Sequence, residues 1–315
     1  MFSGYLAIIT TILLWSGFFL SLRGGAISAL TPADMALTRF LIPALVLLPI
    51  TFYSRKLIFS VPKRYLVGMV VGGGLPYLLV AGLAMNYATV SDGSALVPGT
   101  LPLFVSAIAV SLFAQPLSQH RKIGLVMIVL GISLFLWSGI SEAETTLVQG
   151  HVLFLLGSMM WAVFTICARI ANFPALVCAG LISLVSFLLL LLLIVTNSIE
   201  SSLFVFGSGQ SWSSNVENWP YQELFGHLLL QGVGAGLIAS FTYLHAISKL
   251  GAERTAAFGS LTPVIATLLA IVIFGEVPPV TTWLGLVCIC TGSIVASNVF
   301  MREDASLAYQ PPKHS

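Results

Sequence analysis

Charged side chains are scarce in this sequence of 315 residues. Only 8% of the residues are Asp, Glu, Lys or Arg, whereas 57% are hydrophobic. About a quarter of the residues are charged in an ordinary soluble domain. The composition therefore excludes that class and favours a protein embedded in a lipid bilayer. The net charge of +2 is too small to indicate nucleic acid as a partner.

The motifs of common enzymes are also missing. The sequence has no GxxxxGK[ST] loop for ATP, no HExxH motif and no Ser/His/Asp grouping. The four cysteines lie inside apolar runs without metal-ligand spacing, which is typical of packing residues; they are Cys167, Cys178, Cys288 and Cys290. We therefore expect no enzyme activity, no catalytic residue, no cofactor and no metal site.

Long apolar runs are what the sequence has in abundance. Each is close to the length of about 20 residues that crosses the hydrocarbon core, and continuous runs in lipid must be helices to satisfy their backbone. The runs are 4–22, 34–53, 65–88, 92–114, 122–140, 151–169, 174–196, 223–248, 254–275 and 280–301. The predicted fold class is an all-α membrane protein with ten transmembrane helices.

The basic residues predict an orientation for these helices. If the N-terminus is cytoplasmic, every Lys and Arg except Arg23 and Arg39 falls on the cytoplasmic side. Lys and Arg gather in cytoplasmic loops of membrane proteins. We therefore expect a multi-pass protein of the inner (plasma) membrane with both termini in the cytoplasm.

The two halves of the chain repeat each other. At an offset of 146 residues, Gly4, Trp15 and Arg23 match Gly150, Trp161 and Arg169. At an offset of 161, Asp92, Pro102, Phe113, Gly124 and Gly131 match Glu253, Pro263, Phe274, Gly285 and Gly292. The difference between the offsets indicates an insertion, which we place in a polar outer loop at 197–222.

We therefore predict one five-helix repeat at 1–140, a second at 150–301 and a disordered cytoplasmic tail at 302–315. Because five is odd, the second repeat enters the membrane inverted relative to the first. Inverted repeats of this kind are the architecture of many secondary transporters, which hold the substrate near the midplane. The pair Gly124/Gly131 is expected to be a helix-packing surface.

These repeated residues resemble the EamA-type family of the drug/metabolite transporter superfamily. The second copy is the closer match, with Leu261-Thr262-Pro263 followed by Phe274-Gly275-Glu276. In the first copy the corresponding turn reads Phe113-Ala114-Gln115, so the glutamate has a glutamine counterpart. The resemblance implies membrane transport through a cavity lined by helices one, three, four, six, eight and nine. It does not imply one substrate, because the family moves amino acids, metabolites, nucleotide precursors or drugs.

Three prolines are candidate hinges. Pro102 and Pro263 are predicted to lie in the middle of their spans, with Pro98 one turn before Pro102. A proline inside a helix frees a backbone carbonyl and can act as a hinge or line a cavity. A tolerated kink is the alternative.

Two charged or titratable residues are candidates for the cavity. Arg39 could bind an anionic group or pair with Asp34 or Asp92, and it could equally extend to the headgroups from a shallow depth. His245 could contact substrate or carry a coupled proton, or simply bond to a neighbouring helix.

Polar aromatic side chains complete the candidate cavity. Trp15 and Trp161 lie near the middle of their spans, where anchoring at the membrane interface explains them poorly. Tyr77, Asn86 and Tyr243 are the other members. Rings with polar tips suit amphipathic organic substrates.

The predicted function is a secondary-active transporter that exports small metabolites, amino acids or drug-like compounds by alternating access. Its expected partners are a small-molecule substrate and the lipid bilayer; a coupled proton or an exchanged solute, and oligomerisation, are left open. A nutrient importer or a facilitator is the alternative within transport. A membrane receptor or subunit that transports nothing is the alternative from another class.

Overall fold

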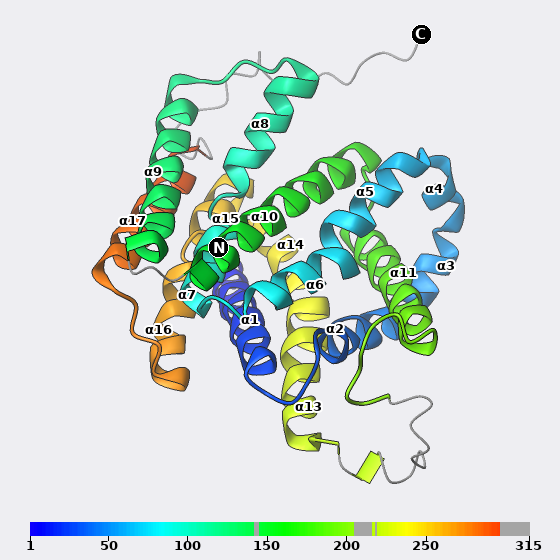
Figure 1. The fold of residues 1–315 in the computed structure, drawn as a ribbon. Coiled ribbons are helices and arrows are strands. Elements are labelled where there is room, and N and C mark those ends of the chain that lie inside the picture. Colours follow the sequence, from blue (N-terminus) through cyan, green and yellow to red (C-terminus); the bar gives the residue numbers. More distant parts are fainter. Residues whose placement is uncertain (142–144, 205–215, 218, 297–315) are drawn as a thin grey trace.

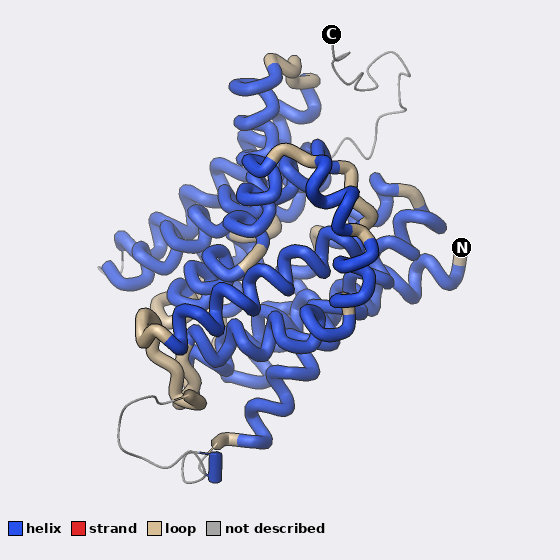
Figure 2. The backbone as a smooth tube through the Cα atoms, turned by 90° about the vertical axis from the view of Figure 1, so that its right-hand side faces the viewer, coloured by secondary structure: helices blue, strands red, loops and turns tan. Residues whose placement is uncertain are grey.

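A computed structural model describes residues 1–141, 145–204, 216–217 and 219–296 (Figure 1). The predicted tail at 302–315, the end of the tenth span at 297–301 and positions 205–215 and 218 of the predicted outer loop lie outside the described residues. The part of the chain that the structure describes is helical and contains no strand (Figure 2).

The helices follow the predicted runs closely, but several runs are divided. In the first half the helices are α1 (Phe2–Ala26), α2 (Pro32–Val46), α3 (Leu48–Tyr53), α4 (Arg55–Ser60), α5 (Lys63–Gly73), α6 (Leu75–Ala84), α7 (Val90–Leu96), α8 (Leu101–Phe113) and α9 (Gln119–Ser141). In the second half they are α10 (Thr145–Ala171), α11 (Ala175–Val195), α13 (Tyr221–His227), the π-helix η1 (Leu228–Ile238), α14 (Ala239–Leu250), α15 (Ala252–Gly259), α16 (Thr262–Phe274) and α17 (Val280–Ala296).

Among the described residues, seven helical segments are long and apolar enough to cross a membrane. They are Phe2–Ala26, Lys63–Ala84, Val90–Phe113, Gln119–Ile140, Thr145–Ala171, Ala175–Val195 and Tyr221–Leu250. The predicted second, ninth and tenth spans are not among them. The second is divided between α2 and α3, just before Pro49, whose ring cannot donate a backbone hydrogen bond. The other two contain the shorter apolar helices α16 and α17.

The prediction that Pro102 and Pro263 lie mid-helix was wrong. Each occupies the first turn of a short helix, α8 or α16, and Pro98 lies in the turn that separates α7 from α8. A proline fits the first helical turn because its missing N–H would have no partner there. Pro102 and Pro263 therefore lie at the start of short helices that follow a non-helical turn, and they do not kink continuous helices.

Helices from the two halves pack against one another in matching pairs. α1 packs against α14 and α16, and α10 correspondingly packs against α5, α6 and α8. α2 packs against α11, and α9 lies along α17 at one side of the molecule (Figure 1). Gly124 and Gly292 meet in the α9–α17 contact, where a Cβ on either glycine would collide with the carbonyl oxygen of the other. The predicted role of Gly124 in helix packing is thus confirmed.

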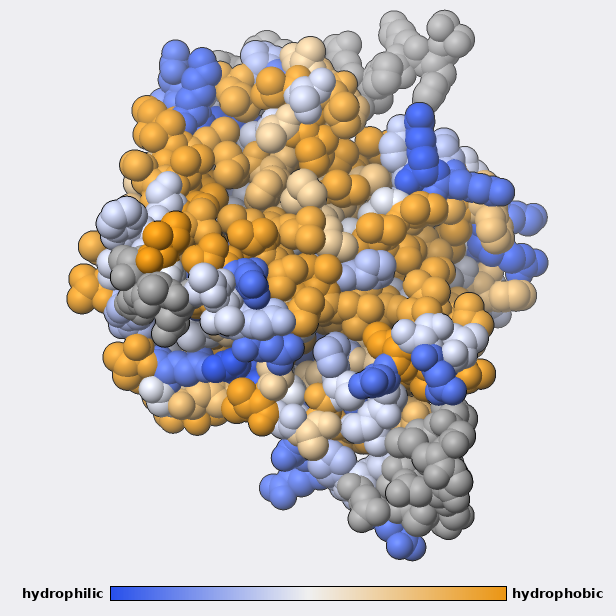
Figure 3. Space-filling model, in the orientation of Figure 1, coloured by the Kyte–Doolittle hydropathy of each residue, from blue (hydrophilic) through white to orange (hydrophobic). Residues whose placement is uncertain are grey.

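The outer surface is strongly apolar. Large hydrophobic side chains project from many helices; Phe59 is 80% exposed and Val272 is 82% exposed. On the face shown in Figure 3, hydrophobic side chains form a broad continuous area, and hydrophilic side chains gather in separate groups. A surface of this extent suits contact with lipid tails rather than water.

Candidate functional site

A cavity of about 260 Å³ lies where the two halves meet. Its walls come from α1, α2, α6 and the α7–α8 break in the first half, and from α10, η1, α14, the α15–α16 break and α17 in the second. The lining residues are Trp15, Phe18, Phe19, Arg39, Tyr77, Val97, Pro98, Gly99, Leu101, Pro102, Trp161, Ala235, Tyr243, Gly259, Ser260, Thr262, Pro263, Cys290 and Ser293.

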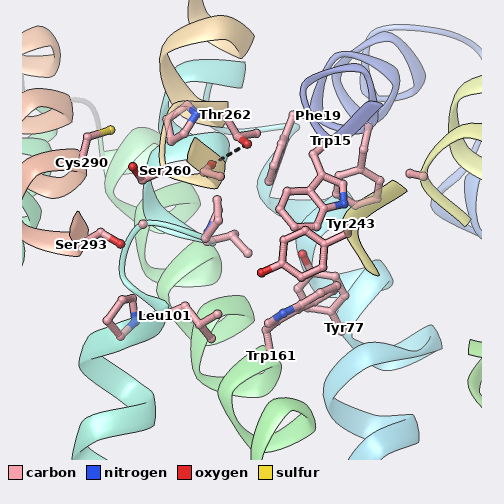
Figure 4. A pocket seen from close by; sticks show the side chains of 18 of the residues that line it. Trp15, Phe19, Tyr77, Leu101, Trp161, Tyr243, Ser260, Thr262, Cys290 and Ser293 are labelled. Atoms are coloured by element: carbon pink, nitrogen blue, oxygen red, sulfur yellow. Dashed lines mark hydrogen bonds between the residues drawn. The ribbon is translucent and has the colours of Figure 1, made fainter. Parts of the chain in front are cut away.

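Two tryptophan–tyrosine pairs dominate this cavity. The ring of Trp15 packs on Tyr243 with a centroid distance of 5.1 Å, and Tyr77 meets Trp161 edge to face at 4.9 Å. Each pair joins the two halves of the chain, and Figure 4 shows the four rings gathered on one side of the pocket. Such pairs favour defined ring positions beyond the effect of burial. The four rings have flat apolar faces, and each ring carries one polar group, a hydroxyl or an indole N–H.

Arg39 supplies a positive charge to the same cavity. Its Nη1 donates to the backbone carbonyl of Gln231 at 2.9 Å, and its guanidinium carbon lies 5.5 Å from the centroid of the Phe18 ring. Gln231 belongs to the π-helix η1, an irregularity that is frequent at functional sites.

The structure does not pair Arg39 with Asp34 or Asp92, which was one of the alternatives that the sequence left open. Asp34 instead accepts hydrogen bonds from Thr31, Ser201 and Ser202. Asp92 forms a capping box with Thr89 at the start of α7 and lies 3.2 Å from Nε2 of His151. Within the described part of the chain, the structure gives Arg39 no carboxylate partner.

Hydroxyl groups form hydrogen bonds at the two breaks between helices, 97–100 and 260–261. At the α7–α8 break, Ser158 Oγ donates to the carbonyl oxygen of Val97 at 2.8 Å, and Thr100 Oγ1 donates to Ser158 Oγ at 2.8 Å. At the α15–α16 break, Thr262 Oγ1 donates to the carbonyl oxygen of Gly259 at 2.7 Å. Hydroxyl side chains commonly satisfy the backbone groups that a broken membrane helix exposes. Both breaks face the cavity (Figure 4).

Five of the seven predicted cavity residues and all three predicted hinge prolines line this cavity. Asn86 and His245 do not. Asn86 is exposed in the turn after α6. His245 is exposed on α14, where Nε2 lies 3.3 Å from Oγ of Ser3. His245 thus contacts a neighbouring helix, which was the alternative to a role in binding substrate or protons.

Sequence reasoning missed several lining residues. Phe18 and Phe19 follow Trp15 by about one helical turn, so helical spacing could have identified them. Ser260 and Ser293 are small hydroxyl residues in apolar runs and carry no such signal, and the sequence predicts only a packing role for Cys290. Arg39 and the α17 residues add helices two and ten to the cavity walls that the resemblance implied.

A second polar cluster lies at one end of the bundle. Arg23 Nε and Glu276 Oε1 form an ion pair at 2.5 Å, and Arg23 Nη1 donates to the carbonyl oxygen of Met85 at 2.7 Å. Glu276 Oε2 accepts from the backbone N–H of Val90 at 3.2 Å, at the first residue of α7. The cluster ties the turn after α16 to two segments of the first half. In the described residues no three His, Cys, Asp or Glu side chains gather as metal ligands.

Comparisons with known proteins agree with this architecture. The profile of the EamA-like transporter family matches residues 2–137 and 148–298. An uncharacterized transporter of Bacillus subtilis (strain 168), YetK, is 23% identical over 275 residues, which cover 85% of this chain and 78% of that protein. A solved crystal structure superposes with a TM-score of 0.59 at 22% identity, over 93% of this chain and 96% of that one. The last likeness concerns the fold alone.

Proposed function

The chain belongs to the EamA-like transporter family and is a multi-pass membrane transporter, and from this premise we propose that it is a secondary-active carrier working by alternating access. In this proposal, ten transmembrane helices form two inverted halves, 1–140 and 150–301. The cavity between the halves binds a small metabolite, amino acid or drug-like compound and releases it on the other side of the membrane.

The observation that carries the proposal is the position of the cavity between the halves. One Trp–Tyr pair joins α1 to α14, and the other joins α10 to α6, so the two pairs stand in corresponding places. Trp15 and Trp161 are also the residues that match at the offset of 146. A cavity of about 260 Å³ is close to the lower end of small-molecule pockets, which begin at about 300 Å³.

The breaks between α7 and α8 and between α15 and α16 provide hinges about which the helices can move. Each half contributes one break beside the cavity, followed by a half-helix that starts at a proline. In many transporters the broken helices line the substrate site, and one half rocks against the other around it. We assign Pro98, Pro102 and Pro263 to these hinges.

Charge distribution supports the orientation that we propose. The excess of Lys and Arg on one side favours both termini in the cytoplasm, and we propose the plasma membrane as the location of the protein. In this orientation Arg23, an exception to the rule, and Glu276 are both expected on the outer side, and the structure pairs them at one end of the bundle. Export driven by a proton gradient or by exchange is the proposed direction.

Transport in proteoliposomes tests this function. Compounds that stabilise the purified protein in a thermal-shift screen of amino acids, purines, sugar phosphates and drugs would be loaded into vesicles under an imposed pH gradient. We expect transport against a concentration gradient that Trp161→Ala and Pro263→Ala reduce at least tenfold. His245→Gln, outside the cavity, should leave the rate unchanged.

Other outcomes select other functions. Equilibration without accumulation would indicate a facilitator, and uptake toward the cytoplasmic side would indicate an importer. Binding without movement across the membrane would indicate a receptor. Unchanged rates in both Trp161→Ala and Pro263→Ala would contradict the cavity assignment.

A further inference from the structure

Among the lining residues that the structure describes, the cavity combines one positive charge with an aromatic wall and includes no acidic side chain. Arg39 is the single charged residue among the lining residues that the structure describes. The remainder are aromatic, aliphatic or small, with hydroxyls at Ser260, Thr262 and Ser293. A ligand must therefore balance a cation on one side and fill an apolar space on the other.

Arg39 retains most of its donor capacity. A guanidinium has five N–H donors, and the described residues engage one of them, Nη1 toward the carbonyl of Gln231. An arginine in the interior of a membrane protein is costly unless it is paired, and it ordinarily has a partner. Because the described residues provide no carboxylate for Arg39, the missing partner would have to come from a ligand.

The surroundings of Arg39 hold its side chain in place before a ligand arrives. The carbonyl of Gln231 comes from the second half and the Phe18 ring comes from the first, so both halves fix the guanidinium. Fixed guanidinium groups bind carboxylates by two parallel hydrogen bonds, which give both strength and orientation.

We propose that the transported molecule is a small organic carboxylate with one ring or a comparable apolar body. Its carboxylate would pair with Arg39, and its apolar part would lie against the Trp15–Tyr243 and Tyr77–Trp161 pairs. This inference rests on the proposed function of the same cavity and names its substrate class. The volume of about 260 Å³ suits a single ring with a short polar group rather than a lipid or a dinucleotide.

A cationic substrate is the main competitor, because aromatic rings also attract cations. Two observations weigh against it. The positive charge of Arg39 would repel a cation in a medium of low dielectric constant. The face of Phe18 is already taken by the guanidinium itself. A zwitterion would need an acidic partner for its ammonium group, and the lining residues include none.

Three compounds of nearly the same shape separate these classes: phenylacetate, phenylacetamide and phenethylamine. We would measure their binding to the purified full-length protein by tryptophan fluorescence and by thermal shift. We expect phenylacetate to bind at least about tenfold more tightly than phenylacetamide, the scale of one charge-assisted pair, and phenethylamine to bind least. Acetate, which lacks the ring, should bind much more weakly than phenylacetate.

Variants of Arg39 show whether the preference comes from this residue. Arg39→Gln keeps a donor for the Gln231 carbonyl, and it should remove the preference for phenylacetate over phenylacetamide while leaving amide binding unchanged. Arg39→Lys should retain part of the preference. A merely structural role would lower binding of both compounds equally, so the ratio is the decisive readout. The melting temperature of each ligand-free variant checks its folding.

The outcomes also separate this inference from the proposed function. Tighter binding of the amide or the amine, still weakened by Trp161→Ala, would overturn the carboxylate class and leave the cavity in place. A preference for phenylacetate that persists in Arg39→Gln, or no saturable binding of any of the compounds, would overturn the inference. Binding of phenylacetate that Trp161→Ala and Tyr243→Ala do not alter would contradict the cavity itself.

Discussion

The two ends of the bundle carry related sequences but different contacts. At the end where α16 stops, Phe274-Gly275-Glu276 places a carboxylate against Arg23 and against the first residue of α7. At the opposite end, where α8 stops (Figure 1), the matching residues are Phe113-Ala114-Gln115. Gln115 carries no charge and cannot form an ion pair. The two matching segments therefore differ at the residue that forms the ion pair with Arg23, which is Glu276 in one segment and Gln115 in the other.

The short helices beside these ends differ in the same direction. Every residue of α7 is buried, whereas Ser106 is the one buried residue of α8. α7 is also capped at its start by Thr89 and Asp92. The comparison teaches that the two ends of the proposed two-fold arrangement differ in their contacts, with the Arg23–Glu276 ion pair at one end and the uncharged Gln115 at the other. We therefore expect the end with the ion pair to be the more stable one.

Breaking the ion pair should have the largest effect on this difference. Glu276→Gln copies the residue of the weaker end and leaves Arg23 without a carboxylate in a mostly buried place. Removing one partner of a buried pair costs about 3 kcal/mol. We expect a clearly lower melting temperature of the purified protein. Arg121→Gln, which removes a hydrogen bond to Ser106 (2.9 Å) near the other end, should cost only about 1 kcal/mol.

The double variant Arg23→Gln/Glu276→Gln sharpens this test. Because it leaves no unpaired charge, it should be more stable than the Arg23→Gln variant or the Glu276→Gln variant alone. Strictly additive losses would show that the two side chains act independently and that the pair does not fasten the end.

A smaller effect is expected from the cap of α7. Asp92→Ala removes the acceptor of the Thr89 N–H (2.8 Å) and the neighbour of the fully buried His151. Loss of a cap costs about 1 kcal/mol and an unsatisfied buried group adds about 1 kcal/mol more. Asp92→Asn keeps a side-chain oxygen that can accept from the Thr89 N–H, and it should lose less stability than Asp92→Ala in thermal unfolding. Equal losses would mean that the charge, rather than the cap, stabilises α7.

The smallest effect concerns the ends of α8 and α16. Both helices end in the left-handed conformation, at Ala114 with φ 49° and at Gly275 with φ 69°. A left-handed alanine costs about 1 kcal/mol that a glycine does not. Ala114→Gly should therefore stabilise the weaker end by up to about 1 kcal/mol, and Gly275→Ala should destabilise the stronger end by a similar amount. Chemical denaturation in detergent compares the two, and a shift of the same sign in both would contradict the account.

Much of the fold could be predicted because lipid imposes simple rules on sequence. Apolar runs of about the length of a span predicted the positions of most helices, and repeated Trp, Pro and Gly residues predicted the internal repeat. Pro98 lies in the break at 97–100, but Pro102 and Pro263 follow the breaks at 97–100 and 260–261 and do not lie in mid-helix. A proline in an apolar run fits the start of a helix as well as its middle. The structure shows where α7 and α15 end, and the hydrogen bonds of Ser158 to the Val97 carbonyl and of Thr262 to the Gly259 carbonyl lie at these ends.

Cavity residues could be predicted where a large polar or charged side chain lies inside an apolar run. Trp15, Trp161 and Arg39 are large or charged residues inside apolar runs, and all three line the cavity. His245 shares that property but faces outward on α14, because a single polar residue does not reveal which side of a helix is buried. The π-helix η1, which positions the Gln231 carbonyl for Arg39, has no recognisable signature in the sequence.

The most direct test asks whether a ligand occupies the cavity between the halves. In a variant without the four native cysteines, Ser260→Cys in the cavity and Ser60→Cys on the exposed surface would be alkylated with and without phenylacetate. The account predicts that phenylacetate slows modification of Ser260→Cys several-fold and leaves Ser60→Cys unchanged. Equal rates at Ser260→Cys with and without phenylacetate would contradict it.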